Sequence, residues 1–503
     1  MKQMLRLKIL ISLIFLVTIF CSIPAFAATT IPFTVNLSKV VNVTGTPRIA
    51  VDVGGVTRYA TYSSGSGSSA LTFTYAMVAG DVDLDGVTVS SPIDLNGGTI
   101  KDLSGNDLSP LTFTVPNTSN VKINYPSLGM DFVYDADGRY TLNGTVYNDL
   151  TSFLSAAGGS FIRSSIGTYF DSGGVLKTAA SGVPRFDYDP NTHAAKGILI
   201  EESRTNLLLQ SDNYTNSPWQ TTSCGGVTNS GSTTTAPNGT LIPIYDFAST
   251  ACLFQDISIT NGSTYTHSIW IKANKSATIG FRNPGSSAFT STNITVGTTW
   301  QRYTITATAD QATSRFLIDN RSFSGYGVTG LQLSFFGGQV EQGTFATSYI
   351  PTTTAAATRQ ADNLSIPIGS WYNSSLGTLY AGMISYNPDI AYSGPILDDS
   401  TSNNSINFIY NNNAGKIYVG GTQQFSFSLS NIYGVFSKTA MAYKSNDVAE
   451  IRNGTGLQTS SSSSIPTVSR LLVSGNSTMT GNIQTFKYYP SRIANTQLQL
   501  LTQ

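Results

Sequence analysis

Short stretches in which apolar and polar residues alternate run along most of the chain. Phe33–Leu37 and Ile49–Val53 show this pattern in the N-terminal part. A period of two is typical of a strand with one buried face. Gly54-Gly55 then predicts a tight turn into a further strand, Thr57–Tyr62. More strands are expected at Leu71–Tyr75 and Leu111–Val115. About seven short strands predict a first β-sandwich over residues 28–118.

The same period recurs in the second half of the chain. In Thr264–Lys272, the side chains of Tyr265, His267, Ile269 and Ile271 share one face of a predicted strand, and Trp270 lies on the other. We therefore expect a second sandwich over 201–355 and, after a Thr/Ala-rich linker at 356–364, a third over 365–503. Strands of the third are expected at Leu379–Tyr386, Ile406–Tyr410, Lys416–Val419, Phe425–Leu429, Phe436–Tyr443 and Ile483–Tyr489, with a last helical turn or two at Asn495–Leu501.

Residues 119–200 lack a long regular pattern and are predicted to connect the first two sandwiches. Asn143-Gly144 marks a hairpin turn. Asp149–Ala157 predicts a short helix that Asp149 caps and that Gly158-Gly159 ends. The predicted fold class is therefore all-β, with three consecutive sandwiches and a small mixed connector.

Composition supports this fold class. Only 11% of residues are charged, and just four of the 28 acidic residues are glutamates. Aspartate favours turns, whereas glutamate favours helix interiors, so the excess of aspartate indicates a loop-rich β protein. The chain has no basic stripe to neutralise phosphates, which argues against a nucleic-acid partner.

Residues 1–27 have the form of a secretory signal peptide. Lys2, Arg6 and Lys8 precede an apolar run of 12 residues, Ile9–Phe20, and Ala25-Phe26-Ala27 offers a small-x-small cleavage site. Twelve residues are too few to span a bilayer well, so cleavage is favoured over a membrane anchor. The mature protein is expected to be secreted or exposed at the cell surface, without a stable membrane span.

Two cysteines remain after cleavage, Cys224 and Cys252. Export permits a disulfide between them, which would stabilise the fold by ~3–4 kcal/mol through loop entropy. Two partly buried free thiols are the alternative.

Three stretches carry a resemblance to known proteins. PRFDYDPNTHAAKGILIEESRTNLLL (Pro184–Leu209), QVEQGTFATSYIPT (Gln339–Thr352) and IQTFKYYPSRIANTQLQLL (Ile483–Leu501) resemble phage-type tail fibre and head spike proteins and their prophage relatives. This resemblance implies a carbohydrate-binding-type jelly roll at 201–355 and a concanavalin A-like, laminin-G-type domain at 365–503. GDVDLDG (Gly80–Gly86) and LNGGTIKDLSGNDL (Leu95–Leu108) resemble bacterial immunoglobulin-like repeats, which implies an immunoglobulin-like first sandwich.

Asp81, Asp83 and Asp85 form a D-x-D-x-D-G loop with Gly86. Carboxylates at alternate positions can converge on calcium, but Pro92 stands where an EF-hand needs a glutamate. A calcium-stiffened loop and a solvated acidic turn both fit. Calcium is the one candidate cofactor, and the sequence requires none.

No arrangement of residues predicts catalysis. Glu450 is the only glutamate of the third sandwich, whereas glycoside hydrolysis normally needs two carboxyl groups that flank the sugar bond. Of the two histidines, His267 shares an apolar strand face and is expected in the core, and His193 lies in a turn. The protein is therefore predicted not to be an enzyme.

Trp270 is the candidate carbohydrate-binding residue. An outward indole on a sandwich can serve as a platform for the C–H face of a sugar; burial under a loop or a neighbouring domain is the alternative. We expect a non-enzymatic adhesion protein that binds glycans or cell-surface polysaccharide. A phage-derived tail fibre or spike and a polysaccharide depolymerase are the competing hypotheses, and the oligomeric state stays open.

Overall fold

The computed structural model describes residues 30–133, 140–221, 224–388, 394–401, 403–407, 415–427, 429, 433–475 and 479–503. The predicted signal peptide, 1–27, lies outside them. The regular elements of the described chain are nearly all strands, with two short α-helices, so the all-β fold class is confirmed. None of the described helices has the length and apolar character that a membrane crossing requires.

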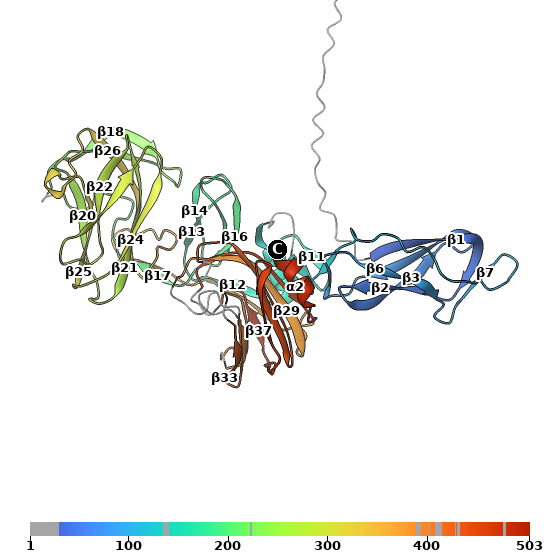
Figure 1. Ribbon diagram of the computed structural model, residues 1–503. Coiled ribbons are helices and arrows are strands. Elements are labelled where there is room, and N and C mark those ends of the chain that lie inside the picture. Colours follow the sequence, from blue (N-terminus) through green and yellow to red (C-terminus); the bar gives the residue numbers. More distant parts are fainter. Residues whose placement is uncertain are drawn as a thin grey trace, which may run out of the picture.

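The N-terminal unit (blue in Figure 1) is a six-stranded sheet with the strand order β6-β2-β3-β4-β1-β7. Its strands are β1 Thr30–Thr44, β2 Arg48–Val53, β3 Val56–Ser64, β4 Ser68–Ala76, β6 Thr88–Asp94 and β7 Thr99–Asp102, while β5 Asp81–Asp83 pairs with β8 Ile123–Tyr125. The alternating residues predicted to face inward, such as Val35, Ile49 and Val51, form its core. The Gly54-Gly55 turn joins β2 to β3 as expected.

Leu111–Val115 is not a strand, although the sequence predicted one. The Ile93 amide donates to the Leu111 carbonyl, but the Phe113 amide donates to Ser91 Oγ rather than to a backbone carbonyl. Pro92 supplies no N–H to this edge. The regular ladder therefore stops after one bond.

The host sandwich is built from two distant parts of the chain. Its larger sheet has the order β11-β10-β9-β38-β29-β34-β35-β36, with β16 also paired to β38 and β15 to β16. The strands are β9 Leu128–Asp131, β10 Tyr140–Leu142, β11 Thr145–Tyr147, β15 Phe186–Tyr188, β16 Ala195–Ile200, β29 Leu376–Ser385, β34 Ser437–Lys444, β35 Asp447–Arg452, β36 Thr455–Ser460 and β38 Gly481–Tyr489.

The second sheet of the host sandwich has the order β12-β28-β37-β30-β31-β32-β33. These strands are β12 Ser160–Ile162, β28 Asn363–Pro367, β37 Arg470–Leu472, β30 Ile396–Asp398, β31 Ser405–Asn407, β32 Lys416–Val419 and β33 Thr422–Ser426. The two sheets enclose one apolar core, to which Met130, Phe153 and Ile198 contribute alongside Leu379 and Phe486. The last three residues of the predicted strand Ile406–Tyr410 lie outside the described residues.

This topology corrects the predicted connector. Residues 119–200 do not merely link two sandwiches, because β9 and β16 pair with β38 and β12 pairs with β28. The local features expected there are present: α1 spans Leu150–Ala157, the Asp149 side chain accepts from the Ser152 amide, and Gly158 is left-handed. Their strands were underestimated because they are only three to six residues long and gain their stability from distant partners.

The inserted sandwich (green to yellow in Figure 1) occupies the chain between the two host segments. Its sheets have the orders β18-β19-β26-β21-β24 and β20-β25-β22-β23. Their strands are β18 Val227–Thr235, β19 Leu241–Phe247, β20 Cys252–Ser258, β21 Thr264–Ala273, β22 Ala277–Arg282, β23 Ser291–Val296, β24 Gln301–Thr308, β25 Thr313–Asp319 and β26 Leu331–Gln342. The chain enters through β17 Arg204–Asn206 and leaves through β27 Ala357–Arg359, which pair with each other.

The N-terminal unit packs against the C-terminal helix α2, Asn495–Thr502, on the other side of the host sandwich (Figure 1). Val82 shares an apolar cluster with Leu498 and Leu501. The Leu84 amide donates to Gln497 Oε1 at 2.8 Å, and Tyr489 donates to Asn124 Oδ1 at 2.6 Å. The helix predicted at Asn495–Leu501 is confirmed, and it serves as the contact surface for the first unit.

The discontinuous host sandwich makes a prediction about fragments. A fragment of residues 365–503, the third sandwich as expected from the sequence, lacks β9, β12, β16 and the first two residues of β28. It therefore exposes the edges of β38 and β28 that these strands cover. We expect it to aggregate or to unfold without a cooperative transition. A chain of residues 120–503 should unfold cooperatively. Circular dichroism during heating distinguishes the two, and a cooperative transition in the shorter fragment would contradict the topology.

Candidate functional site

A buried network of charges lies where the chain crosses between the host and inserted sandwiches. We call the five side chains that form it, Arg163, Arg185, Glu201, Arg359 and Asp362, the junction network. Asp362 receives Arg163 Nη1 at 2.9 Å and also pairs with Arg185, while Glu201 receives Arg185 Nη1 at 2.6 Å and Arg359 Nη1 at 3.2 Å. All five side chains are at most 2% exposed.

The arginines hold Glu201 in its ionised form. Burial by itself would raise the pKa of Glu201, but Arg359 and Arg185, together with hydrogen bonds from Ser348, lower it to about 2. Ser348 donates to Glu201 through both its amide, at 2.7 Å, and its hydroxyl, at 2.6 Å. These bonds fix Ser348 of the inserted sandwich to Glu201, which stands just before that sandwich begins.

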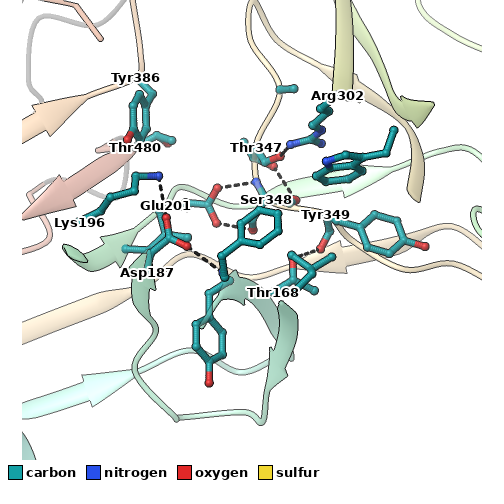
Figure 2. A pocket seen from close by; sticks show the side chains of 16 residues that line it. Thr168, Asp187, Lys196, Glu201, Arg302, Thr347, Ser348, Tyr349, Tyr386 and Thr480 are labelled. Carbon is teal, nitrogen blue, oxygen red and sulfur yellow. Dashed lines mark hydrogen bonds and ion pairs between the residues drawn. The ribbon is translucent and has the colours of Figure 1, made fainter. Parts of the chain in front are cut away.

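The junction pocket is a cavity of about 260 Å³ beside this network. Figure 2 shows its wall, which host, hairpin and inserted sandwich build together. The hairpin is formed by β13 Gly167–Phe170 and β14 Leu176–Ala179. The lining residues are Thr168, Tyr169, Phe170, Leu176, Asp187, Lys196, Leu199, Glu201, Trp270, Arg302, Ala346, Thr347, Ser348, Tyr349, Tyr386 and Thr480.

The pocket combines aromatic rings with fixed polar groups. Tyr169, Phe170, Lys196, Ser348 and Tyr386 keep part of their surface exposed, so solvent reaches the wall. Aromatic faces accept the C–H face of a sugar ring, and charged groups around them orient its hydroxyls. The volume lies just below the roughly 300–1,000 Å³ of pockets that take drug-sized ligands, which suits one or two sugar rings.

Two pairs of groups set the polar side of the pocket. Asp187 accepts from the Phe170 amide at 2.9 Å and from Lys196 Nζ at 2.7 Å. Burial lowers the pKa of Lys196, but Asp187 and Tyr386 more than compensate and raise it, so Lys196 is a cation. Across the pocket, the Arg302 guanidinium lies 4.3 Å from the centre of the Trp270 ring.

Trp270 takes the position that parity predicted and is buried there. It points away from the core of its sandwich, but it is only 7% exposed because Phe170 and Leu176 of the β13–β14 hairpin and Tyr349 cover it. The expectation of an exposed platform is therefore corrected to the buried alternative. The ring still contributes to the pocket wall.

The three aspartates of the acidic loop do not gather around one point. Arg58 donates to Asp81 through Nη2 at 2.7 Å, the Gly54 and Gly86 amides donate to Asp83, and Gln497 Nε2 donates to Asp85 at 2.6 Å. The side chains of Asp81 and Asp83 are buried, so the solvated turn is not observed either. Among the described residues no group of three His, Cys, Asp or Glu could hold a metal ion. The loop instead forms part of the contact with α2.

The two cysteines and His267, also singled out in the sequence, lie in the interior of the inserted sandwich. Cys224 and Cys252 form a disulfide with Cα atoms 5.0 Å apart, the first of the two alternatives. His267 is fully buried: Nε2 lies 2.9 Å from Ser314 Oγ, and burial lowers its pKa to about 3. It is a neutral core histidine, as expected.

Glu450 lies on the buried inner face of β35, away from the junction pocket. Its Oε2 accepts from the Gly415 amide at 2.7 Å, and Oε1 has no hydrogen-bond partner among the described residues. Burial raises its pKa to about 8, against smaller opposing effects of Arg452 and Gly415. None of its recorded partners is a second carboxylate.

Sequence reasoning missed most of the pocket. Arg302 stands on a strand without a motif of its own, while Asp187 and Lys196 lie in a stretch that indicated only a domain type, and the meeting of the three depends on the insertion. The resembling stretches Pro184–Leu209 and Gln339–Thr352 were the available signal, because both supply residues to the pocket and to the groups around Glu201. What the sequence did not show is that the two stretches meet at one place.

No family model and no curated protein matches this chain. Solved structures that match include one titled "CBM4 structure and function", with 16% identity over 29% of this chain and 96% of that chain and a TM-score of 0.20. Domain 4 of AbnA, a GH43 extracellular arabinanase from Geobacillus stearothermophilus in complex with arabinotriose, matches with 11% identity over 32% of this chain and 83% of that domain, with a TM-score of 0.24.

A third match is the N-terminal CBM22-1-CBM22-2 tandem domain of Xyn10C from Paenibacillus barcinonensis. The identity is 10% over 57% of this chain and 98% of that chain, with a TM-score of 0.22. At these TM-scores the similarities do not assign a function to the chain.

The junction network predicts a large effect of removing one charge. Asp362→Ala leaves Arg163 without an ion-pair partner and Arg185 Nη2 without its carboxylate in a buried site, which should cost about 3–5 kcal/mol in the free energy of unfolding. Asp256→Ala removes a carboxylate from a partly exposed pair with Arg315 and should cost less than about 1 kcal/mol. Urea denaturation followed by circular dichroism compares them; equal costs would contradict the role of the network.

Glu450 predicts a pH dependence of stability. Its pKa is about 8 in the folded protein and 4.5 ordinarily, so between these pH values the folded state keeps a proton that the unfolded state loses. Stability should therefore fall by up to ~1.4 kcal/mol per pH unit across this window as the pH rises. Glu450→Gln should weaken this dependence and raise stability at pH 8 more than at pH 5. A variant whose urea midpoints change equally at both pH values would contradict the assignment.

Proposed function

We propose that this protein binds carbohydrate without cleaving it, and that the junction pocket holds the sugar. The observation that carries the proposal is the wall itself: Phe170, Tyr169 and Tyr386 offer ring surfaces beside the fixed charges of Lys196 and Asp187. A sugar ring presents the complementary surface, with an apolar C–H face and polar hydroxyls around its edge.

We propose binding without cleavage because the two carboxylates of the pocket wall already have partners. Glu201 is bound by two arginines and by Ser348, and Asp187 by Lys196 and the Phe170 amide. Neither is placed as a free general acid or nucleophile, which hydrolysis of a glycosidic bond requires. We therefore favour retention of the sugar over its cleavage.

The proposed setting is the cell exterior, where the protein would act in adhesion. The signal-like segment 1–27 and the Cys224–Cys252 disulfide support export. Recovery of the protein from culture supernatant or from intact cells would favour this setting, whereas recovery with cytoplasmic phage-like particles would favour a fibre or spike role.

A glycan array with the full mature chain tests binding, and Ala346→Trp tests the pocket. Ala346 lies in the wall with part of its surface exposed, so an indole there should fill the cavity and reduce glycan affinity at least about tenfold. Ala312→Trp introduces the same ring at an exposed position elsewhere on the inserted sandwich and should leave the affinity unchanged.

Three outcomes would contradict the proposal. They are the absence of any bound glycan, equal losses in the two tryptophan variants, and the release of reducing ends from a bound polysaccharide. Isothermal titration with the best glycan of the array supplies the affinities, and melting temperatures of both variants confirm that they are folded.

A further inference from the structure

The charges around the junction pocket do not cancel. The basic side chains that line it or stand directly behind it are Arg163, Arg185, Lys196, Arg302 and Arg359. The acidic ones are Asp187, Glu201, Glu341 and Asp362. One positive charge therefore has no counterpart among these described residues.

Arg302 forms no ion pair with any of these carboxylates, although Glu341 and Glu201 lie near enough to favour its charged form. Asp362 and Glu201 are shared among the three arginines of the junction network, and Asp187 pairs with Lys196. Glu341 accepts from the Thr347 amide at 3.0 Å and from the Thr347 hydroxyl at 2.5 Å. No carboxylate of a described residue lies within ion-pair distance of Arg302.

Arg302 is held by neutral groups only. Its Nη1 donates to the Thr347 carbonyl at 2.7 Å (Figure 2). Its Nη2 donates to Ser268 Oγ at 2.9 Å, and its Nε has no hydrogen-bond partner among the described residues. Of the five N–H donors of a guanidinium, these bonds use two. The flat face of the group rests on the Trp270 ring, 4.3 Å from its centre, which fixes its orientation.

A guanidinium stays charged even when burial lowers its pKa, and a partly desolvated charge without a counter-ion is costly. An anion in the pocket would remove that cost. Arginine offers a planar fork, which fits the planar carboxylate in a two-point contact.

We propose that the sugar held in the junction pocket is acidic: a uronic or nonulosonic acid residue of a glycan, whose carboxylate accepts hydrogen bonds from Arg302. Lys196 faces the pocket from the opposite side as a second cation, and Phe170 and Tyr169 offer the surface for the ring. This inference rests on the proposed function, since it names the class of sugar for the same pocket.

The first experiment changes the ligand rather than the protein. Binding of the full mature chain to a uronic-acid polysaccharide is measured beside the same polysaccharide after chemical reduction of its carboxyl groups to hydroxymethyl groups. Sialylated, sulfated and neutral glycans complete the series. We expect carboxylated glycans to bind at least about tenfold more tightly than the reduced form. Because the guanidinium fork also pairs with tetrahedral oxyanions, sulfated glycans serve as the competing class of anion, and the proposal requires that they bind no more tightly than carboxylated ones.

The second experiment removes the charge. Arg302→Gln should lower the affinity for the carboxylated glycan at least about tenfold and change the affinity for its reduced form less than about threefold. Arg315→Gln removes one positive charge from the same sandwich, away from the pocket, and should change neither affinity. If the Arg302 variant does not fold, the comparison of native and reduced polysaccharide decides the question on the unaltered protein.

The outcomes separate this inference from the proposed function. Binding of native and reduced polysaccharide with equal affinity, lost in both cases in Ala346→Trp, would overturn the acidic sugar and leave glycan binding standing. Equal effects of Arg302→Gln and Arg315→Gln, or a preference for sulfated glycans, would also overturn it. Absence of binding to any glycan would overturn both.

Discussion

The architecture depends on a network of buried ion pairs between residues far apart in the sequence. Arg163 and Arg185 come from the first host segment, Glu201 stands at its end, and Arg359 and Asp362 stand where the chain returns. Taking ions out of water is expensive, so such a network yields little net stability compared with apolar packing. Its effect is to specify geometry, because a misplaced charge at this depth would have no partner. Because the paired charges lie directly beside the pocket, they also hold its walls in place.

Local chemistry made much of the fold predictable from the sequence. The alternation around Tyr265–Ile271 placed His267 inside and Trp270 outside, and the structure has both as expected. Asp149 and Gly158 predicted a helix of eight residues with its two ends. These successes share one property, since each depends on residues that are neighbours in the chain or alternate along one strand.

The predictions that were wrong concern features that depend on residues far away in the sequence. The three residues of β12 have no pattern that identifies them as a strand, and they become one only beside β28, some 200 residues later. The indole of Trp270 faces outward, but its cover, the β13–β14 hairpin, is formed by residues about 100 positions earlier. In the acidic loop, spacing left a calcium-stiffened loop and a solvated turn open. The structure instead binds Asp81 to Arg58 and Asp85 to Gln497, two partners that no local rule connects to the loop. Long-range partners decide such cases.

The paired strands β17 and β27 have a mechanical consequence. Because the chain enters and leaves the inserted sandwich through adjacent strands, that sandwich is a side branch and not a bead on a string. Tension transmitted from the N-terminal unit to the host sandwich passes through the backbone between β8 and β9, beside the contacts with α2, and bypasses the branch. A load applied at the branch itself would pull β17 and β27 together in the same direction, with the junction pocket at the fork.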